Sequence, residues 1–265
     1  MQLNNKVSVI TGAASGIGAA CARKFASKGA KLVIVDIDES KSREVAKDVD
    51  GIAIPCDLND PSAISNMISE VEETVGPIDL LFNNAGIATG RGPLDTDLEE
   101  WQRQWNVNLM SHVHAVRAVL PGMLERGEGY ILHTASMAGI LSTHDNLPYA
   151  VSKHAVVGLA EWLAFTYMHR GIRVGLLAPL AVRTPMLGSQ ANSEWANQAG
   201  GPIKEAEAEE VAEQVFDSIV DERFLILTDQ IANKWMRQKT SDPDRWLHGM
   251  NRLQQRLDKA SNHEN

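Results

Sequence analysis

The sequence predicts an α/β fold, in which a doubly wound parallel sheet of about seven strands is covered by helices on both faces. Two observations support this prediction. Short runs of aliphatic and β-branched residues alternate with longer helical patterns along most of the chain. Several of the short runs are apolar at consecutive positions, which is typical of strands buried on both sides. The 265 residues, 44% of them hydrophobic, are expected to form a single domain over 1–265.

The expected elements follow one another as strand and helix. The strands are expected at residues 6–11, 31–37, 51–56, 78–84, 129–135, 172–178 and 224–227. The helices are expected near residues 16–28, 40–48, 61–75, 98–125, 149–169 and 206–221. Alternation at these lengths predicts right-handed crossovers between parallel strands. The acidic run at 205–210 fits the solvated first turns of the last helix, because carboxylates stabilise the positive end of a helix dipole.

Two segments depart from this alternation. Residues 187–204 are polar and glycine-rich, and they follow the C-terminal end of a strand, where α/β sheets bind ligands. We expect this segment to be a substrate lid. Residues 229–265 are expected to form a helical tail with an apolar face made of Trp246, Leu247, Met250, Leu253 and Leu257. That face has two interpretations: it packs on the parent domain or another subunit, or it covers the substrate.

The charge of the chain argues against nucleic-acid and membrane partners. The formal net charge is −9, and the one dense charge run is acidic. Nucleic acids and anionic membranes are bound by clustered Lys and Arg, so neither is expected. No apolar run reaches the roughly 18 residues of a membrane-spanning helix, and the first strand is expected from residue 6, with no signal-peptide pattern before it. We therefore expect a cytoplasmic protein.

The cysteines and histidines show no metal-binding pattern. Cys21 and Cys56 have neither metal-ligand spacing nor that of a disulfide framework, and we interpret both as small buried residues. Four of the histidines are interpreted as surface or packing residues: His112, His114, His133 and His154. No metal is expected.

A glycine-rich turn follows the first expected strand. Gly12, Gly16 and Gly18 have the spacing G-x-x-x-G-x-G, and an alanine-rich helix follows them. Such glycines let the backbone approach a pyrophosphate at the positive end of the helix. A turn without a ligand could share this spacing, but the strand before it and the helix after it are the context of a dinucleotide site.

The end of the second strand favours NAD over NADP. Asp36 follows the glycines by about 20 residues, where a carboxylate accepts both ribose hydroxyls of NAD and repels a 2′-phosphate. Ser15 stands before Gly16, where a basic residue would favour NADP. The alternative is an ordinary aspartate at the end of a strand.

Further motifs follow in order. They are Asn83-Asn84-Ala85-Gly86, Asn108, Ser136, Tyr149-x-x-x-Lys153 and Thr184-Pro185-Met186. Together with the glycine turn, this ordered set resembles the short-chain dehydrogenase/reductase family over residues 5–228. The resemblance implies a single-domain Rossmann fold, NAD as the cofactor, and a homodimer or homotetramer formed through the helices at 98–125 and 149–169.

The resemblance also implies four catalytic residues. Reduction of a ketone builds negative charge on its oxygen, and that charge must meet a proton donor. Tyr149 is expected to be this acid, and the base in the oxidation direction. Lys153 and the oxidised nicotinamide are expected to lower the pKa of Tyr149, and Lys153 to bind the nicotinamide ribose. Ser136 is expected to orient the substrate oxygen, and Asn108 to hold a water that links Lys153 to solvent.

The expected cofactor contacts lie where the strands end. They are Gly12, Ser15, Gly16, Ile17, Gly18, Asp36, Ile37, Asp57, Leu58, Asn84, Ala85, Gly86, Tyr149, Lys153, Pro179, Val182 and Thr184. The sequence departs from the family at Ala178-Pro179-Leu180, where Asn-Pro-Gly is usual. The isobutyl group of Leu180 is expected to narrow the substrate pocket or make it more apolar.

The expected substrate contacts are mostly apolar. They are Ser136, Met137, Leu141, His144, Tyr149, Leu180, Met186 and Trp195. No arginine is obviously placed for a carboxylate, which favours a neutral, fairly hydrophobic secondary alcohol of aryl, alicyclic or steroid-like type and its ketone.

Two other functions are weighed against this one. A 3-oxoacyl thioester reductase would prefer NADPH and present a basic surface to an acidic carrier protein, which Asp36, Ser15 and the acidic balance disfavour. A non-catalytic NAD-binding sensor or scaffold is disfavoured by the intact Ser136, Tyr149 and Lys153.

Overall fold

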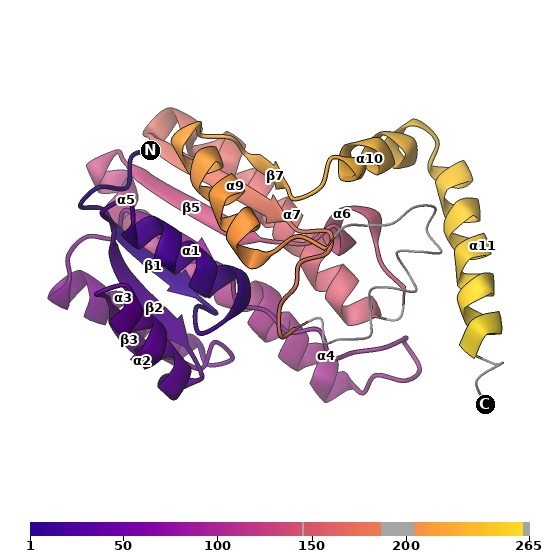
Figure 1. The fold of residues 1–265 in the computed structure, drawn as a ribbon, viewed down its shortest axis with the longest axis horizontal. Coiled ribbons are helices and arrows are strands. Elements are labelled where there is room, and N and C mark those ends of the chain that lie inside the picture. Colours follow the sequence, from indigo (N-terminus) through magenta and orange to yellow (C-terminus); the bar gives the residue numbers. More distant parts are fainter. Residues whose placement is uncertain (145, 187–204, 262–265) are drawn as a thin grey trace.

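The computed structural model describes residues 1–144, 146–186 and 205–261 (Figure 1). In these residues seven strands form one parallel sheet, which confirms the predicted fold class. The strands are β1 (Val7–Thr11), β2 (Lys31–Asp36), β3 (Ile52–Pro55), β4 (Leu80–Asn83), β5 (Gly129–Thr134), β6 (Ile172–Ala178) and β7 (Leu225–Leu227). Their order across the sheet is β3-β2-β1-β4-β5-β6-β7.

Helices cover both faces of the sheet. They are α1 (Gly16–Ala26), α2 (Glu39–Asp48), α3 (Pro61–Thr74), α4 (Leu98–Trp105), α5 (Ser111–Arg126), α6 (Ala138–Leu141), α7 (Leu147–Tyr167), α9 (Ala208–Val220), α10 (Ile231–Ser241) and α11 (Pro243–Ser261). Buried residues of α1, α2 and α9 pack in one layer, and those of α3, α5 and α7 pack in the other. Successive strand residues alternate between the two layers, which explains why the strands read as continuous apolar runs.

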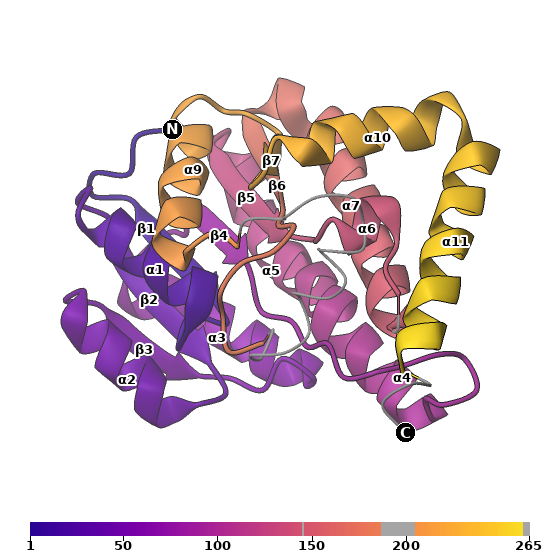
Figure 2. The same cartoon turned by 45° about the vertical axis from the view of Figure 1, so that its right-hand side comes forward.

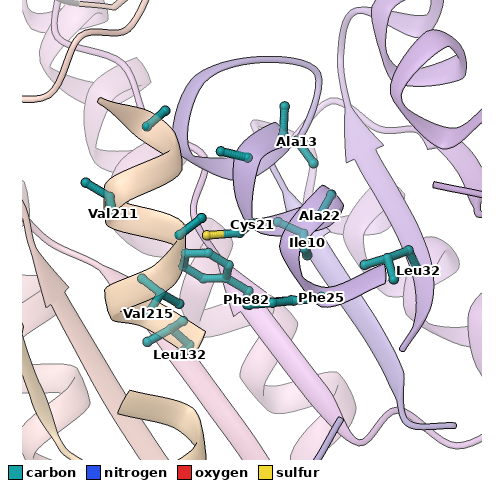
Figure 3. Packing of buried hydrophobic residues seen from close by; sticks show 14 of the residues in the cluster. Ile10, Ala13, Cys21, Ala22, Phe25, Leu32, Phe82, Leu132, Val211 and Val215 are labelled. Carbon is teal, nitrogen blue, oxygen red and sulfur yellow. The ribbon is translucent and has the colours of Figure 1, made fainter. Parts of the chain in front are cut away.

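The layer under α1 and α9 shows how closely the helices lie on the sheet. Figure 3 shows Phe25 of α1, Phe82 of β4 and Val215 of α9 packed together, with Cys21 between the two helices. All four residues are fully buried. Both cysteines are buried and unpaired, as the sequence analysis predicts.

Local sequence signals begin several helices. The side chains of Asp38, Asp60 and Asp97 accept hydrogen bonds from first-turn N–H groups of α2, α3 and α4. Glu207 and Glu210 form a capping box at the start of α9. Glu209 and Glu210 lie in the first turn of α9, which confirms the predicted position for this end of the acidic run.

The sheet reverses its direction of growth between β1 and β4. From β1 the chain builds outward through β2 and β3, then returns to add β4 on the other side and continues to β7. Such a reversal opens a crevice at the C-terminal ends of the two central strands, which is where ligands bind in open parallel sheets.

The structure differs from the expected elements in three places. The single helix expected at 98–125 is α4 and α5 joined by a π-helical turn, Asn106–Met110, and such turns often mark functional sites. A short helix, α6, follows β5. The expected tail is two helices, α10 and α11, which lie beside α6 at one end of the molecule (Figure 2). The expected lid at 187–204 lies outside the described residues.

Among the described helices, none combines the length and apolar character needed to cross a membrane.

Candidate active site

A cavity of ≈ 1410 Å³ lies at the C-terminal edge of the sheet. Its wall contains almost every residue that the sequence analysis selects for the cofactor and the substrate. Gly18 and Asn108 do not line the cavity, and Trp195 lies outside the described residues. One continuous space therefore joins the expected cofactor residues to the expected catalytic ones.

The glycine turn allows a ligand to approach the protein backbone at the start of α1. Gly12 has φ +63, and a Cβ there would lie 2.7 Å from Cα of Ala85. At Gly18 a Cβ would lie 2.4 Å from the carbonyl oxygen of Gly12, so only a glycine allows the helix to pack this closely on the turn. Ser15 is the N-cap of α1 but makes no side-chain capping bond among the described residues. The first amides of α1 are therefore open to an anion such as a pyrophosphate.

Asp36 is oriented toward the same space. Its Oδ2 accepts a hydrogen bond from the N–H of Ala14, and its Oδ1 from the N–H of Asp38, each at 3.0 Å. A carboxylate has about four acceptor positions, so this geometry leaves capacity for ribose hydroxyls. Ile37 is 72% exposed and lines the cavity beside Asp36 with an apolar surface. The end of β2 thus offers the cavity a hydrogen-bond acceptor beside an apolar surface.

Thr11 and Asn84 link the ends of three strands across the crevice. Thr11 Oγ1 accepts hydrogen bonds from the N–H groups of Asn84 at 2.9 Å and Ala85 at 3.1 Å. The Asn84 Nδ2 donates to the carbonyls of Thr11 and Gly12, and its Oδ1 accepts from Thr134 Oγ1 at 3.1 Å. Asn84 is therefore part of the scaffold as well as of the wall. The sequence analysis did not assign Thr11 this role, since the bonds join residues 73 positions apart.

Tyr149 lies in the first turn of α7, and Ser136 lies just beyond β5. The Asn146 side chain caps α7 by accepting a hydrogen bond from the N–H of Tyr149 at 3.1 Å, which fixes where the tyrosine leaves the helix. Burial raises the pKa of Tyr149, and a hydrogen bond with Ser136 acts in the opposite direction. The two hydroxyls thus lie near each other on the cavity wall.

Lys153 is 2% exposed, and its Nζ donates to the carbonyl of Thr134 at 2.8 Å. Burial lowers the pKa of Lys153 to about 7. The Nζ lies 5.7 Å from the centre of the Tyr149 ring. The expectation that Lys153 and the oxidised nicotinamide together lower the pKa of Tyr149 stays a prediction.

Asn108 lies in the π-helical turn behind the catalytic wall. Its Nδ2 donates to the carbonyl of Ile87 at 2.9 Å and to Ser152 Oγ at 3.1 Å, and its Oδ1 accepts from the N–H of Ile87 at 2.7 Å. Both amide hydrogens are thus used within the protein. The side chain ties the segment after β4 to α7, and a role in holding a water beside Lys153 stays a prediction.

Two histidines form a buried pair next to the site. His112 and His133 are at most 1% exposed, their rings stack with centroids 5.2 Å apart, and their Nδ1 atoms are 3.1 Å apart. That contact needs one donor and one acceptor, so at least one ring is neutral. Burial lowers the pKa of His133 to about 3 and that of His112 well below its usual value, with Lys153 acting in the same direction. Both are packing residues, as expected.

This pair is expected to make the protein acid-sensitive. An unfolded histidine takes up a proton near pH 6.5, whereas the folded pair does so only at lower pH. The folded state therefore binds fewer protons below pH 6.5, and each histidine should cost about 1.4 kcal/mol of unfolding free energy per pH unit of acidification. The fall in Tm from pH 6.5 to 5.0 should be smaller in His133→Gln than in wild type. His169→Gln, at an exposed histidine, should keep the wild-type slope, and equal slopes in all three proteins would contradict the prediction.

The wall beyond Ser136 is apolar. Met137 and Leu141 are buried there in a cluster with Ala178 and Ala232, and Leu180 packs against this cluster. Met186 lines the cavity but is 49% exposed. The side chain of Leu180 thus lies at the junction between the cavity and the tail helices, and the N–H of Leu180 donates to Thr228 Oγ1 at 3.1 Å.

The apolar face of the tail both packs on the parent domain and lines the cavity, and the interpretation that it covers the substrate stays a prediction. Trp246, Met250 and Leu253 line the cavity, whereas Leu247 is 62% exposed. His144 Nδ1 lies 2.6 Å from Gln254 Oε1, which joins the wall near α6 to α11. The sequence analysis missed other lining residues of the tail: Trp235, Gln238, Ser241, Asp242, Arg245, Gly249, Arg252 and Arg256. Arg245, Arg252 and Arg256 recur at helical spacing, and this pattern could have identified the three arginines.

Comparison with known proteins agrees with this geometry. The family model described as short chain dehydrogenase matches residues 6–195. The 1-deoxy-11-beta-hydroxypentalenate dehydrogenase of Streptomyces exfoliatus is 32% identical over 256 residues, which cover 94% of this chain and 91% of that protein. The chain belongs to the short-chain dehydrogenase family. This short-chain dehydrogenase is therefore an oxidoreductase.

Two further proteins place this short-chain dehydrogenase among NAD-binding relatives and dehydrogenases. A mitochondrial borneol dehydrogenase of Lavandula x intermedia is 35% identical over 229 residues, covering 83% of this chain and 86% of that one. The crystal structure of a short chain dehydrogenase/reductase from Burkholderia phymatum in complex with NAD superimposes with a TM-score of 0.82. It is 32% identical, and the match covers 92% of this chain and 96% of the other.

Proposed function

We propose that this enzyme interconverts a secondary alcohol and a ketone with NAD, and that Tyr149 is its general acid and base. The observation that carries the proposal is the convergence of Ser136, Tyr149 and Lys153 on the same cavity wall that Asp36 and the glycine turn reach. A non-catalytic NAD-binding protein would have no need to keep a buried lysine next to a hydrogen-bonded tyrosine. Relatives named for the dehydrogenation of hydroxylated compounds support the same reaction class.

The residues of this chain supply the proton chemistry. NAD, when bound, accepts or gives the hydride. Ser136 Oγ holds the substrate oxygen next to the Tyr149 hydroxyl, and Tyr149 moves the proton to or from that oxygen. Lys153 lies behind the tyrosine with a pKa near 7, so it can take up or release a proton at neutral pH. Asn108 holds the segment after β4 against α7 and so keeps these groups in register.

The proposal of NAD over NADP rests on Asp36. Its carboxylate lines the cavity at the end of β2, where the ribose of a dinucleotide lies in this fold. A 2′-phosphate beside it would place like charges in contact. The same feature disfavours a 3-oxoacyl thioester reductase that uses NADPH.

The test is NAD reduction with a broad panel of secondary alcohols, followed by absorbance of NADH. We expect turnover with substrates whose carbinol is attached to a hydrophobic aryl, alicyclic or steroid-like framework, because Met137, Leu141 and Leu180 form the neighbouring wall. Tyr149→Phe provides the background rate. If no alcohol in the panel exceeds that background, the proposed function is wrong.

We also propose that the enzyme is a homodimer or homotetramer assembled through α7. The outer face of this helix carries Val151, Trp162 and Phe165, and Met168 follows its last residue. All four are exposed, and the rings of Trp162 and Phe165 pack edge-on with centroids 6.3 Å apart. Exposed aromatic side chains grouped on one face are typical of subunit interfaces.

Trp162→Glu is expected to disrupt this assembly, because a carboxylate would lose its hydration in the interface. Light scattering after gel filtration should give a multiple of 29.0 kDa for the wild type and a smaller mass for the variant. Leu94→Glu replaces an apolar residue that is 95% exposed in the loop before α4 and should leave the mass unchanged. A wild-type mass of one chain would refute the interface.

A further inference from the structure

Three arginines of α11 line the mouth of the cavity: Arg245, Arg252 and Arg256. Their spacing of seven and four residues places them along one face of the helix. Leu253 lies on the adjoining face of the helix, where it is buried and also lines the cavity. The arginines therefore border the space that a substrate at Ser136 and Tyr149 would occupy.

These guanidinium groups have no acidic partner among the described residues, whereas the other charges at this end are paired or capped. Arg103, which also lines the cavity, forms an ion pair with Glu100 at 2.8 Å. Asp242 lines the cavity too, and its Oδ1 accepts a hydrogen bond from the N–H of Arg245 at 3.0 Å, which caps the first turn of α11. One carboxylate thus faces three cations at the mouth.

These cations lie together although the chain is acidic overall and although their repulsion destabilises the helix. The formal net charge is −9, so a positive cluster is not a reflection of the average surface. Arg252 and Arg256 are four residues apart on a helix, where like charges repel and destabilise it slightly. An anionic ligand bound between them would remove that repulsion.

The helix that carries them is docked on the site. Leu253 is 7% exposed, and Trp246 packs against the cluster of Met137 and Leu141. Gln254 contacts His144 of the cavity wall, and Lys239 of α10 donates to the carbonyl of Ile140. These contacts set the arginines at a defined place relative to Ser136 and Tyr149.

We propose that the substrate carries an anionic oxygen group, a carboxylate or phosphate, which Arg245, Arg252 and Arg256 bind at the mouth while its alcohol lies at Tyr149. This inference rests on the proposed function and names the substrate class of that site. Guanidinium groups bind such oxyanions with paired hydrogen bonds. Between the two ends, the apolar wall around Leu180 suits a hydrocarbon framework. The expected substrate is amphipathic, and this replaces the neutral alcohol that the sequence analysis favours.

The test compares substrates that differ in charge alone. Hydroxyalkanoic acids with the alcohol next to the chain end, from six to fourteen carbons, are assayed beside their methyl esters and beside alkyl phosphates of the same hydroxyalkyl chains. In the wild type, one oxyanion series should have a KM below that of the neutral esters at the best chain length, and the difference should shrink in high salt. The series with the lower KM identifies the oxyanion.

The variant is the double substitution Arg252→Gln with Arg256→Gln. It should raise KM for the preferred oxyanion by about tenfold, since charge-assisted hydrogen bonds are lost. The kcat for that substrate and the KM for the ester should stay unchanged. Arg237→Gln makes the same change on α10 outside this cavity and should behave as wild type. Equal KM values for acid, phosphate and ester, or an equal effect of the double variant on all three, would overturn the inference.

A binding measurement separates this inference from the proposed reaction. Decanoate and decyl phosphate, which have no alcohol to oxidise, should raise the Tm of the wild type and of Arg237→Gln more than that of the double variant. If no secondary alcohol is oxidised, the reaction is wrong, and this shift alone decides whether the arginines bind an oxyanion. An equal shift in all three proteins, or none in any, refutes the arginine site.

Discussion

Replacing Tyr149 by phenylalanine is expected to lower kcat by about 10²–10⁴-fold, the range supplied by a positioned general acid or base. The hydroxyl is the group on the cavity wall that bonds to Ser136 and faces the space for the substrate oxygen. Without the hydroxyl, no acid meets the negative charge that develops on the substrate oxygen, while the phenyl ring still fills its place in the cavity wall. The loss should therefore fall on kcat. The Kd for NADH, measured by fluorescence titration, should change by no more than about tenfold, since one net hydrogen bond contributes about 0.5–1.5 kcal/mol.

Tyr130→Phe is the matched control for this variant. Tyr130 is fully buried in β5, and its hydroxyl has no hydrogen-bond partner among the described residues. The same atom is thus removed from a tyrosine outside the cavity, and kcat should stay at the wild-type value. The assignment of Tyr149 would be wrong if both variants retained full activity or lost it equally.

Replacing Asp36 by alanine is expected to reverse the preference for NAD. Hydrogen bonds to a charged group contribute about 1.5–3 kcal/mol, so kcat/KM for NAD should fall by roughly 10–100-fold. The value for NADP should rise, because the carboxylate that repels a 2′-phosphate is gone. The two backbone bonds that Asp36 accepts from Ala14 and Asp38 would also be lost, so Tm should be recorded to separate loss of fold from loss of recognition.

Asp48→Ala removes the same charge from the exposed end of α2, outside the cavity. It should leave the ratio of kcat/KM for NAD to that for NADP unchanged. A wild-type enzyme that uses both cofactors equally, or an Asp36→Ala enzyme with an unaltered ratio, would contradict the role of this carboxylate.

The parts of the molecule that sequence reasoning predicted are those determined locally. Strand and helix positions follow from periodicity and caps, and the glycine turn follows from the positive φ angles that Gly12 and Gly16 adopt. The breaks between α4 and α5 were not predicted, because the pattern of apolar residues is nearly the same for a π-helical turn as for a continuous helix.

Features that depend on contacts between residues far apart in the chain could not be predicted from the sequence. The pKa of Tyr149 depends on how deeply α7 buries it, and the pairing of His112 with His133 requires α5 to pack on β5. The arginines of α11 line the same cavity as Ser136 only because of the course of the tail, more than 100 residues later in the chain. Their spacing is visible in the sequence, but the surface that they face is not.

The tail also separates two tasks along the chain. The residues proposed for proton transfer and cofactor binding lie on the sheet, its loops and α7, whereas α10 and α11, after the last strand, line another part of the cavity. A protein engineer could thus randomise or exchange the C-terminal segment from residue 229 as a single cassette.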